Sequence, residues 1–438
     1  MDSSAEASGR VFAAAAFAAL LIAAVALNSF RIGWVPIRGF ATLGALALAL
    51  LFYFPVAKRV FAEYRLLLAL AAGLAVLGVF VSLVNGASPA GVFRQVAEVH
   101  VQAAATILAA AILARVAGAR ASTLAIVAVI SASAFVAMGQ MLDIQPAWAL
   151  RRALGPLPTE EIEGLNFLER RPVGLSFSPI TLSTHLCLGF ATFLAVRSKL
   201  RGPASGADPL VVPALLAFFA ACIACATRSP ILGGLIFLAV YAIQQRTSWM
   251  PIFLVVAAAI AYFVWPLLTS VFETAAPRLL ETDDNSAKAR STLVYYGLRL
   301  FADNPLGYGL TFAPMTLWQG YWPDLYMMQS PQGTRENDLH NYLVTMINVY
   351  GVGLLLLTPI VARLIWQIRA SLIFFIPYMV HIFFHNSGPF HTDNVIWFAI
   401  AAIAAAEPVR LEQPAGAGGR IARRTMPRRM SPVRGRFG

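Results

Sequence analysis

Long apolar segments alternate with short polar segments along almost the whole chain. About 20 apolar residues in a helix cross the hydrocarbon core of a bilayer, and a scan with that length predicts about twelve membrane-spanning helices. The predicted spans are residues 11–27, 39–56, 66–84, 97–114, 122–142, 179–196, 209–226, 229–245, 249–269, 340–362, 371–385 and 392–407. The pattern therefore predicts an all-α polytopic membrane protein.

The basic residues of the short connections predict how the chain is oriented. Lys and Arg concentrate in the cytoplasmic loops of membrane proteins, and here they fall mostly on one side of the predicted membrane. That side carries Lys58, Arg59, Arg65, Arg115, Arg120, Arg197, Lys199, Arg201, Arg246, Arg363 and Arg369. Both termini are therefore expected inside the cell, and Arg31, Arg38 and Arg94 lie on the outer side as exceptions to the bias.

Two long connections that contain many acidic residues lie on the outer side, at residues 143–178 and 270–339. We expect residues 1–269 to form nine spans that include the first of these loops. Residues 270–339 then form a large periplasmic loop domain of short helices, and residues 340–407 form the last three spans. Residues 408–438 are basic and rich in Pro and Gly, which predicts a disordered cytoplasmic tail.

The composition excludes a soluble globular protein. Hydrophobic residues make up 59% of the chain and charged residues 12%, with a mean hydropathy of +0.70, whereas soluble domains carry roughly 25% charged residues. The net charge of +12 comes largely from the tail, which favours contact with anionic lipid headgroups over nucleic-acid binding. Cys187, Cys222 and Cys225 lie in apolar segments and fit small hydrophobic residues, with no disulfide or zinc framework.

Arg228 lies in a short turn between two apolar segments on the outer side. It belongs to the sequence Thr227-Arg228-Ser229-Pro230, and Pro230 favours the first turn of a helix. A guanidinium beside the free N–H groups of a helix start is suited to bind phosphate. The alternative is an arginine whose charged end reaches the membrane interface, but its outer position favours the phosphate site.

The outer loops supply three further candidate residues. His340 ends the second long loop at the edge of an apolar helix, where an imidazole can accept a proton near neutral pH, and Asp338 or Glu336 could orient it. Arg290 begins an amphipathic stretch of the same loop, and Arg171 ends the first long loop. Taken singly, Arg290 also fits a solvated helix face and His340 a structural histidine.

A metal site is not expected. His381 and His385 are four residues apart and would share one helix face, so they could in principle chelate a metal ion. The glutamate of the metalloprotease motif is absent, and no cofactor motif is found elsewhere in the chain.

The order of these short motifs resembles that of the O-antigen ligase and Wzy-type polymerase superfamily. The resemblance rests on the Thr227-Arg228-Ser229 turn, on Arg290, on Asp303-Asn304-Pro305-Leu306-Gly307-Tyr308-Gly309, on His340-Asn341-x-Leu343 and on Gly351-Val352-Gly353. It is strongest over residues 170–360, and the flanking spans match only in being apolar.

The resemblance implies a metal-independent glycosyltransferase with a helical membrane fold of the GT-C type. Members of this superfamily take a glycan from undecaprenyl diphosphate at the periplasmic face of the bacterial inner membrane. Ligases pass the glycan to lipid A–core, and polymerases pass it to another lipid-linked repeat. By resemblance, Arg228 and Arg290 would bind the diphosphate, with Arg171 adding positive charge, and His340 would act as base on the acceptor hydroxyl.

Three functions remain open from the sequence. A ligase is favoured by the single large loop with an arginine and a histidine near its ends, and an O-antigen or exopolysaccharide polymerase is the alternative. A polysaccharide or lipid-linked sugar transporter would place ionisable residues inside several spans, where this chain has mainly Glu98, His100 and His185. For a transferase we expect a lateral opening near Arg228 that admits the polyprenyl chain.

Overall fold

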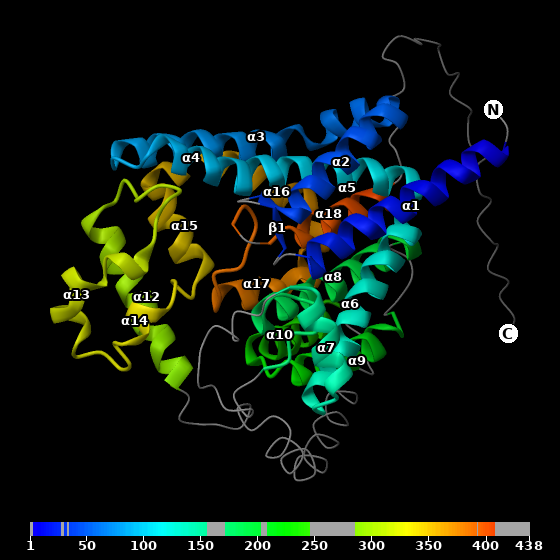
Figure 1. The fold of residues 1–438 in the computed structure, drawn as a ribbon. Coiled ribbons are helices and arrows are strands. Elements are labelled where there is room, and N and C mark those ends of the chain that lie inside the picture. The colour runs from blue at the N-terminus through cyan, green and yellow to red at the C-terminus, as the bar shows by residue number, and fades with distance from the viewer. Residues whose placement is uncertain are drawn as a thin grey trace, which may run out of the picture. The chain divides into compact units, whose positions relative to one another are not determined.

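The computed structural model describes residues 3–27, 30–32, 35–155, 171–202, 208–245, 285–391 and 393–407, and these are mostly helical (Figure 1). The first half contains α1 (Ser3–Ala26), α2 (Ile37–Phe52), α3 (Phe54–Val84), α4 (Pro89–Gln95), the π-helical turn η1 (Val96–Val101), α5 (Gln102–Ala117), α6 (Ala119–Met141) and α7 (Gln145–Ala153). Between α1 and α2, the two-residue strands β1 (Arg31–Ile32) and β2 (Val35–Pro36) pair antiparallel in a segment predicted to be a loop.

The second half contains α8 (Pro179–Arg201), α9 (Val211–Ala224), α10 (Arg228–Gln245), α12 (Asn285–Asp303), η5 (Pro314–Thr316), α13 (Trp318–Leu325), α14 (Gly333–Glu336), α15 (Tyr342–Tyr350), η6 (Gly351–Leu357), α16 (Thr358–Ile368), η7 (Arg369–Phe375), α17 (Ile376–Phe383) and α18 (Val395–Ala405). The elements from α15 to α17 follow one another as a single helical run, Tyr342–Phe383. His340 and His385 therefore lie just outside this run, one at each end.

The prediction of an all-α membrane protein is confirmed, but the count of twelve spans is not. Among the described residues, six helical runs are long and apolar enough to cross a membrane: Glu6–Ala26, Phe54–Val84, Pro89–Ala117, Ala119–Met141, Pro179–Arg201 and Tyr342–Phe383. Four shorter apolar helices accompany them: Ile37–Phe52, Val211–Ala224, Arg228–Gln244 and Val395–Ala405. The predicted span 249–269 and the predicted tail 408–438 lie outside the described residues.

The centre of the helical bundle is formed by α5 and α8. α5 contacts α1, α2, α3 and α18, and α8 contacts α6, α9, α17 and α18. Most residues of α5 are buried, among them the alanines Ala103, Ala105, Ala109, Ala110, Ala111 and Ala114. Inside a membrane the hydrophobic effect does not drive helices together, because lipid tails are as apolar as the side chains. Helices there associate through close packing, which small side chains allow.

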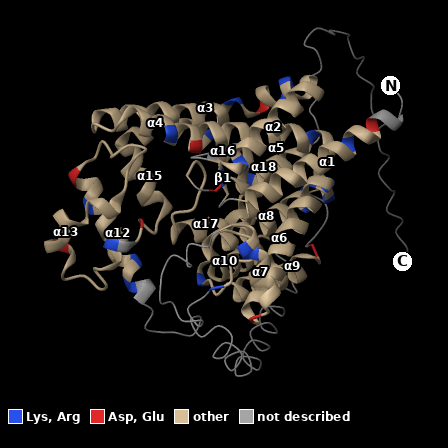
Figure 2. Cartoon of the chain, in the orientation of Figure 1, with Lys and Arg blue, Asp and Glu red and all other residues tan. Residues whose placement is uncertain are grey.

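The charged residues gather at helix ends and in loops, and most helical surface is uncharged (Figure 2). Large apolar side chains on the peripheral helices are exposed, for example Leu51, Val76, Leu124, Phe135 and Ile243. Such exposure would be unfavourable over so wide a surface in water, and it fits helices whose outer faces contact lipid.

The segment from α12 to α14 has a small hydrophobic core of its own. Tyr296 and Leu300 of α12 are fully buried with Leu325 of α13 and Leu339, and Val344 of α15 closes the cluster. Short helices were predicted for residues 270–339, and α13 and α14 are short, whereas α12 has 19 residues. The periplasmic position of this segment stays a prediction. The first part of the predicted domain, residues 270–284, lies outside the described residues.

The glycine-rich segment after α12 docks on α3 and on the end of α15. The backbone N–H of Gly309 donates to the carbonyl of Val349 at 2.9 Å, and the Ser82 hydroxyl accepts from the Leu310 N–H at 2.7 Å. Gly309 has φ +85°, and a Cβ there would come within 2.7 Å of the Ser82 backbone. This part of the family-like motif is therefore a structural clasp that fixes the segment from α12 to α14 to the bundle.

Candidate functional site

Arg228 is the first residue of α10, as Pro230 predicts. α9 ends at Ala224, and Ala226 adopts the left-handed conformation (φ 49°) in the turn between the two helices. Ser229 is buried behind Arg228, whose side chain is half-buried. The sharp turn therefore places Arg228 at the start of α10, where backbone N–H groups lack helical partners.

Arg171 lies against the same turn. Its Nη2 donates to the carbonyl oxygen of Ala226 at 3.0 Å and to the hydroxyl oxygen of Thr227 at 2.8 Å. The end of the first outer loop is thus fixed beside the residue that precedes Arg228. Arg171 and Arg228, which were predicted from separate loops, therefore lie at the same turn between α9 and α10.

The position of Arg171 depends on Gln140, a buried residue near the end of α6. The side-chain oxygen of Gln140 accepts from the N–H groups of Val173 and Gly174, both at 2.8 Å. Gly174 has φ +59°, and a Cβ there would lie 2.3 Å from the carbonyl oxygen of Ser133. The short segment that follows Arg171 is therefore clamped on α6.

His381 links the start of α10 to the start of α8. Its Nδ1 lies 2.9 Å from the hydroxyl oxygen of Ser229, and its Nε2 lies 3.2 Å from the carbonyl oxygen of Ile180. Because a carbonyl oxygen can only accept, Nε2 carries the proton and Nδ1 accepts from the serine. His381 is fully buried and holds the N-terminal turns of two helices together.

His385 and His340 extend this contact outward. The rings of His381 and His385 have centroids 4.5 Å apart, and those of His385 and His340 are 6.3 Å apart. His385 is 1% exposed, and neither of its ring nitrogens has a hydrogen-bond partner among the described residues. A buried polar group without a partner is costly, and such groups are typical of sites that complete their hydrogen bonds with a ligand.

His340 has a defined tautomer. Its Nδ1 lies 2.8 Å from the backbone carbonyl oxygen of Asp338, so Nδ1 carries the proton and Nε2 is left as an acceptor. Burial lowers the pKa of His340 below its usual value, the Asp338 carbonyl opposes this shift, and the charge of Arg290 lowers the pKa further. A neutral imidazole with a free lone pair is the form that a general base requires.

Arg290 and Arg171 lie close enough to the histidines to act on them electrostatically. Arg290, half-buried on α12, acts electrostatically on His340 and on His385, and Arg171 also acts on His385. Arg228 adjoins this group through its chain neighbours Thr227 and Ser229. We call Arg171, Arg228, Arg290, His340, His381 and His385 the arginine–histidine cluster.

The cluster combines guanidiniums with neutral imidazoles. Guanidinium groups form charge-assisted, often bidentate hydrogen bonds with phosphate oxygens. A neutral imidazole at the edge of such a group can take a proton from a hydroxyl. In the described part of the chain, no group of three or more His, Cys, Asp or Glu side chains is arranged to hold a metal ion.

Sequence reasoning missed the role of His381 and His385 in this arrangement. Their spacing of one helical turn predicted only a possible metal pair. The same spacing places both histidines on one helix face, and that face contacts His340 and Ser229. The group that orients His340 is the backbone carbonyl of Asp338, whereas a carboxylate of Asp338 or Glu336 was expected.

Comparison with known proteins identifies the central part of the chain. Residues 213–359 match a family model described as O-antigen ligase, and this range contains Arg228, Arg290 and His340, while Arg171 precedes it. No curated protein and no solved structure was found to match. The resemblance predicted from the sequence is therefore confirmed: over residues 213–359 the chain carries a domain of the O-antigen ligase family.

Proposed function

We propose that this protein is an O-antigen ligase-type glycosyltransferase, which moves a glycan from undecaprenyl diphosphate to lipid A–core at the periplasmic face of the bacterial inner membrane. The observation that carries the proposal is the arginine–histidine cluster. His340 has its Nδ1 proton fixed on the Asp338 carbonyl, and the charges of Arg290 and Arg171 act on the neighbouring His385.

The reaction needs one proton acceptor and one site for a leaving diphosphate. The hydroxyl oxygen of the acceptor attacks the anomeric carbon of the donor glycan, and Nε2 of His340 takes the hydroxyl proton. A new glycosidic C–O bond forms as the anomeric C–O bond to the diphosphate breaks. The bonding electrons leave with undecaprenyl diphosphate, whose negative charge increases by one.

Arg171, Arg228 and Arg290 stabilise that developing charge. Fixed guanidiniums in a partly dry site stabilise a transition state because they require no reorganisation as the charge forms. Arg171 is fixed by Ala226 and Thr227, and Arg228 is the first residue of α10. The N–H groups of that helix start add partial positive charge.

An apolar groove can take the polyprenyl chain of the donor. It lies between α6, α8 and α9, encloses about 390 Å³ and is lined among others by Phe135, Phe190 and Ala217. Ala221, in the last turn of α9, also lines it and lies just before the turn that carries Arg228. A lipid tail in this groove would bring its diphosphate toward the arginines, as the expected lateral opening requires.

The test uses purified protein in detergent or nanodiscs with an undecaprenyl-diphosphate-linked glycan. One arm contains lipid A–core, another contains only lipid-linked repeats, and His340→Ala serves as the inactive comparison. A glycan attached to lipid A–core by the wild type and not by His340→Ala would support a ligase.

The other outcomes separate the alternatives. Longer lipid-linked chains without use of lipid A–core would replace the ligase by a polymerase with the same cluster. Donor binding without transfer to either acceptor, together with movement of the lipid-linked glycan across a vesicle membrane, would identify a transporter and overturn the proposal.

A further inference from the structure

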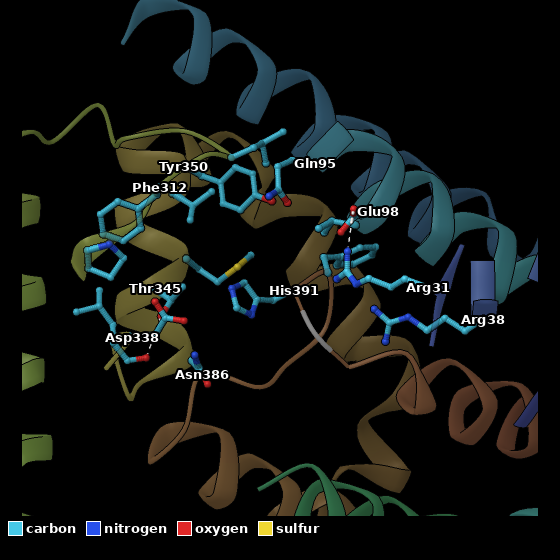
Figure 3. Close-up of a pocket in the computed structure, with 17 residues that line it drawn as sticks. Arg31, Arg38, Gln95, Glu98, Phe312, Asp338, Thr345, Tyr350, Asn386 and His391 are labelled. Atoms are coloured by element: carbon cyan, nitrogen blue, oxygen red, sulfur yellow. Dashed lines mark hydrogen bonds and ion pairs between the residues drawn. The ribbon is translucent and has the colours of Figure 1, made fainter. Parts of the chain in front are cut away.

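A second polar site lies beside the arginine–histidine cluster but shares none of its residues. It is a cavity of about 280 Å³ between the β1–α2 segment, η1, α15 and the loop before α18. Its volume lies near the lower end of the range of about 300–1,000 Å³ that is usual for small-molecule sites. Figure 3 shows Arg31 and Arg38 pointing into it from one side and Asp338 and Asn386 from the opposite side.

The lining of this cavity mixes hydrogen-bond donors with acceptors. Arg31 and Arg38 can only donate, Glu98 and Asp338 can only accept when ionised, and Asn386 can do both. The two guanidiniums and the two carboxylates balance in charge. A ligand with many hydroxyl groups, each able to donate and to accept, suits such a lining better than an anion does.

Aromatic and apolar side chains complete the wall. Phe312, Tyr350 and Phe390 line the cavity together with Leu310 and Met346. An uncharged sugar ring presents C–H faces as well as hydroxyl edges, so it can pack against aromatic rings while its edges meet the polar groups. The cavity therefore has the chemistry of a site for one neutral sugar residue.

The polar end of the cavity is held in place by ion pairs. Glu98 lies 3.6 Å from Nη1 of Arg31 and 2.8 Å from Nε of Arg94. Its side chain is 15% exposed, while those of the two arginines are 46% and 48% exposed. One carboxylate thus anchors two guanidiniums, and it holds Arg31 in the lining of the cavity.

The cavity and His340 share a wall. Asp338 and Leu339 line the cavity, and the carbonyl of Asp338 accepts the Nδ1–H of His340. Asn386, also in the lining, follows His385, whose ring is next to that of His340. The cavity therefore borders His340 through its chain neighbour Leu339, and it borders His385 through Asn386.

We propose that this cavity is the acceptor subsite and binds the terminal neutral sugar of the acceptor glycan, with the reacting hydroxyl directed to His340. This rests on the proposed transferase function. Asp338 has two roles: its carbonyl positions His340, and its carboxylate binds an acceptor hydroxyl. Arg31 and Arg38, exceptions to the charge bias of the chain, are the donors that bind the far side of the sugar.

The experiment separates acceptor binding from donor binding. Asp338→Asn keeps the backbone carbonyl on which His340 depends, and Met346→Trp fills the cavity with an apolar side chain. Asp324→Asn is the matched control, because Asp324 is an exposed carboxylate that pairs with Arg299 outside the cavity. Binding of a delipidated core oligosaccharide is measured without donor, and KM is measured for each substrate in the transfer assay.

We expect both cavity variants to weaken oligosaccharide binding and to raise the acceptor KM by at least about tenfold, which is typical for loss of a hydrogen bond to a charged group. The donor KM should stay unchanged, and Asp324→Asn should match the wild type. A rise in the donor KM alone, or an unchanged acceptor KM in both variants, would overturn the acceptor subsite and leave the transferase intact. A third outcome is that the wild type binds the oligosaccharide but transfers no glycan, and that both cavity variants lose this binding. That outcome would support the sugar site and contradict the proposed reaction.

Discussion

Nδ1 of His340 lies 2.8 Å from the backbone carbonyl oxygen of Asp338. This single contact determines which ring nitrogen is free, because the carbonyl can only accept a hydrogen bond. It also makes the orientation of the imidazole independent of any ionisable partner, so the base keeps its geometry as the pH changes.

The first prediction concerns the pH dependence of transfer. Neutral His340 is the active form, and burial and Arg290 lower its pKa, so kcat/KM should be full at pH 7. It should fall only as the pH drops below the usual histidine pKa of about 6.5. Arg290→Gln removes a positive charge that opposes protonation of His340. The acidic limb of its pH profile, where kcat/KM falls, should therefore move to higher pH.

Arg299→Gln is the control for this shift. Arg299 is on the same helix as Arg290 but pairs with Asp324 at the surface, so its loss should leave the acidic limb in place. A limb that stays unchanged in Arg290→Gln would show that Arg290 does not act on the base.

The second prediction concerns arginine geometry. Arg228→Lys and Arg290→Lys keep the charge but lose the planar fork that binds two phosphate oxygens, and transfer should fall by at least about tenfold in each. Steady-state transfer with saturating acceptor measures this loss. Arg299→Lys should retain wild-type activity, and full activity in the first two variants would contradict direct diphosphate binding.

The third prediction concerns the apolar groove. Ala217 is exposed on α9 and lines the groove, so Ala217→Trp should fill it and raise the KM for a donor with a full-length polyprenyl chain. For a donor analogue with a short polyprenyl chain, the KM of Ala217→Trp should equal that of the wild type. Leu216→Trp places the same side chain on a 64% exposed neighbour that does not line the groove and should behave as the wild type.

The fourth prediction concerns the clasp formed by the glycine-rich segment. Gly309→Ala introduces a Cβ at a positive φ and against the Ser82 backbone, which should cost about 1–3 kcal/mol of stability. Thermal unfolding in detergent should show a lower midpoint. Gly320→Ala adds a methyl group where no atom lies within 4 Å, and a similar loss in this control would contradict the steric explanation.

Local signals in the sequence predicted much of the fold. Apolar length predicted the membrane helices, and Pro230 predicted the start of α10 because proline favours the first helical turn. The break between spans 340–362 and 371–385 stays a prediction. The helices follow one another over Tyr342–Phe383, but the 3-10 segments Gly351–Leu357 and Arg369–Phe375 interrupt them. The run turns back on itself, because the rings of His340 and His385 at its two ends are 6.3 Å apart.

The composition of the site was harder to predict because it depends on contacts between distant chain segments. Arg171 meets Thr227, and His381 meets Ser229 and Ile180, and no periodicity encodes such pairs. The arginines at positions 31 and 38 were noticed only as exceptions to a charge rule. Their shared cavity appears once the folded chain brings them opposite Asp338.

Gln140 has a consequence for how a change outside the site reaches it. Its side-chain oxygen accepts from Val173 and Gly174, and its side-chain nitrogen donates to the carbonyl of Ala147 at 3.4 Å. One residue of α6 thus holds both α7 and the segment that follows Arg171. Loss of this one amide would loosen both contacts together and disturb the position of Arg171 against Thr227, although Gln140 lies outside the arginine–histidine cluster.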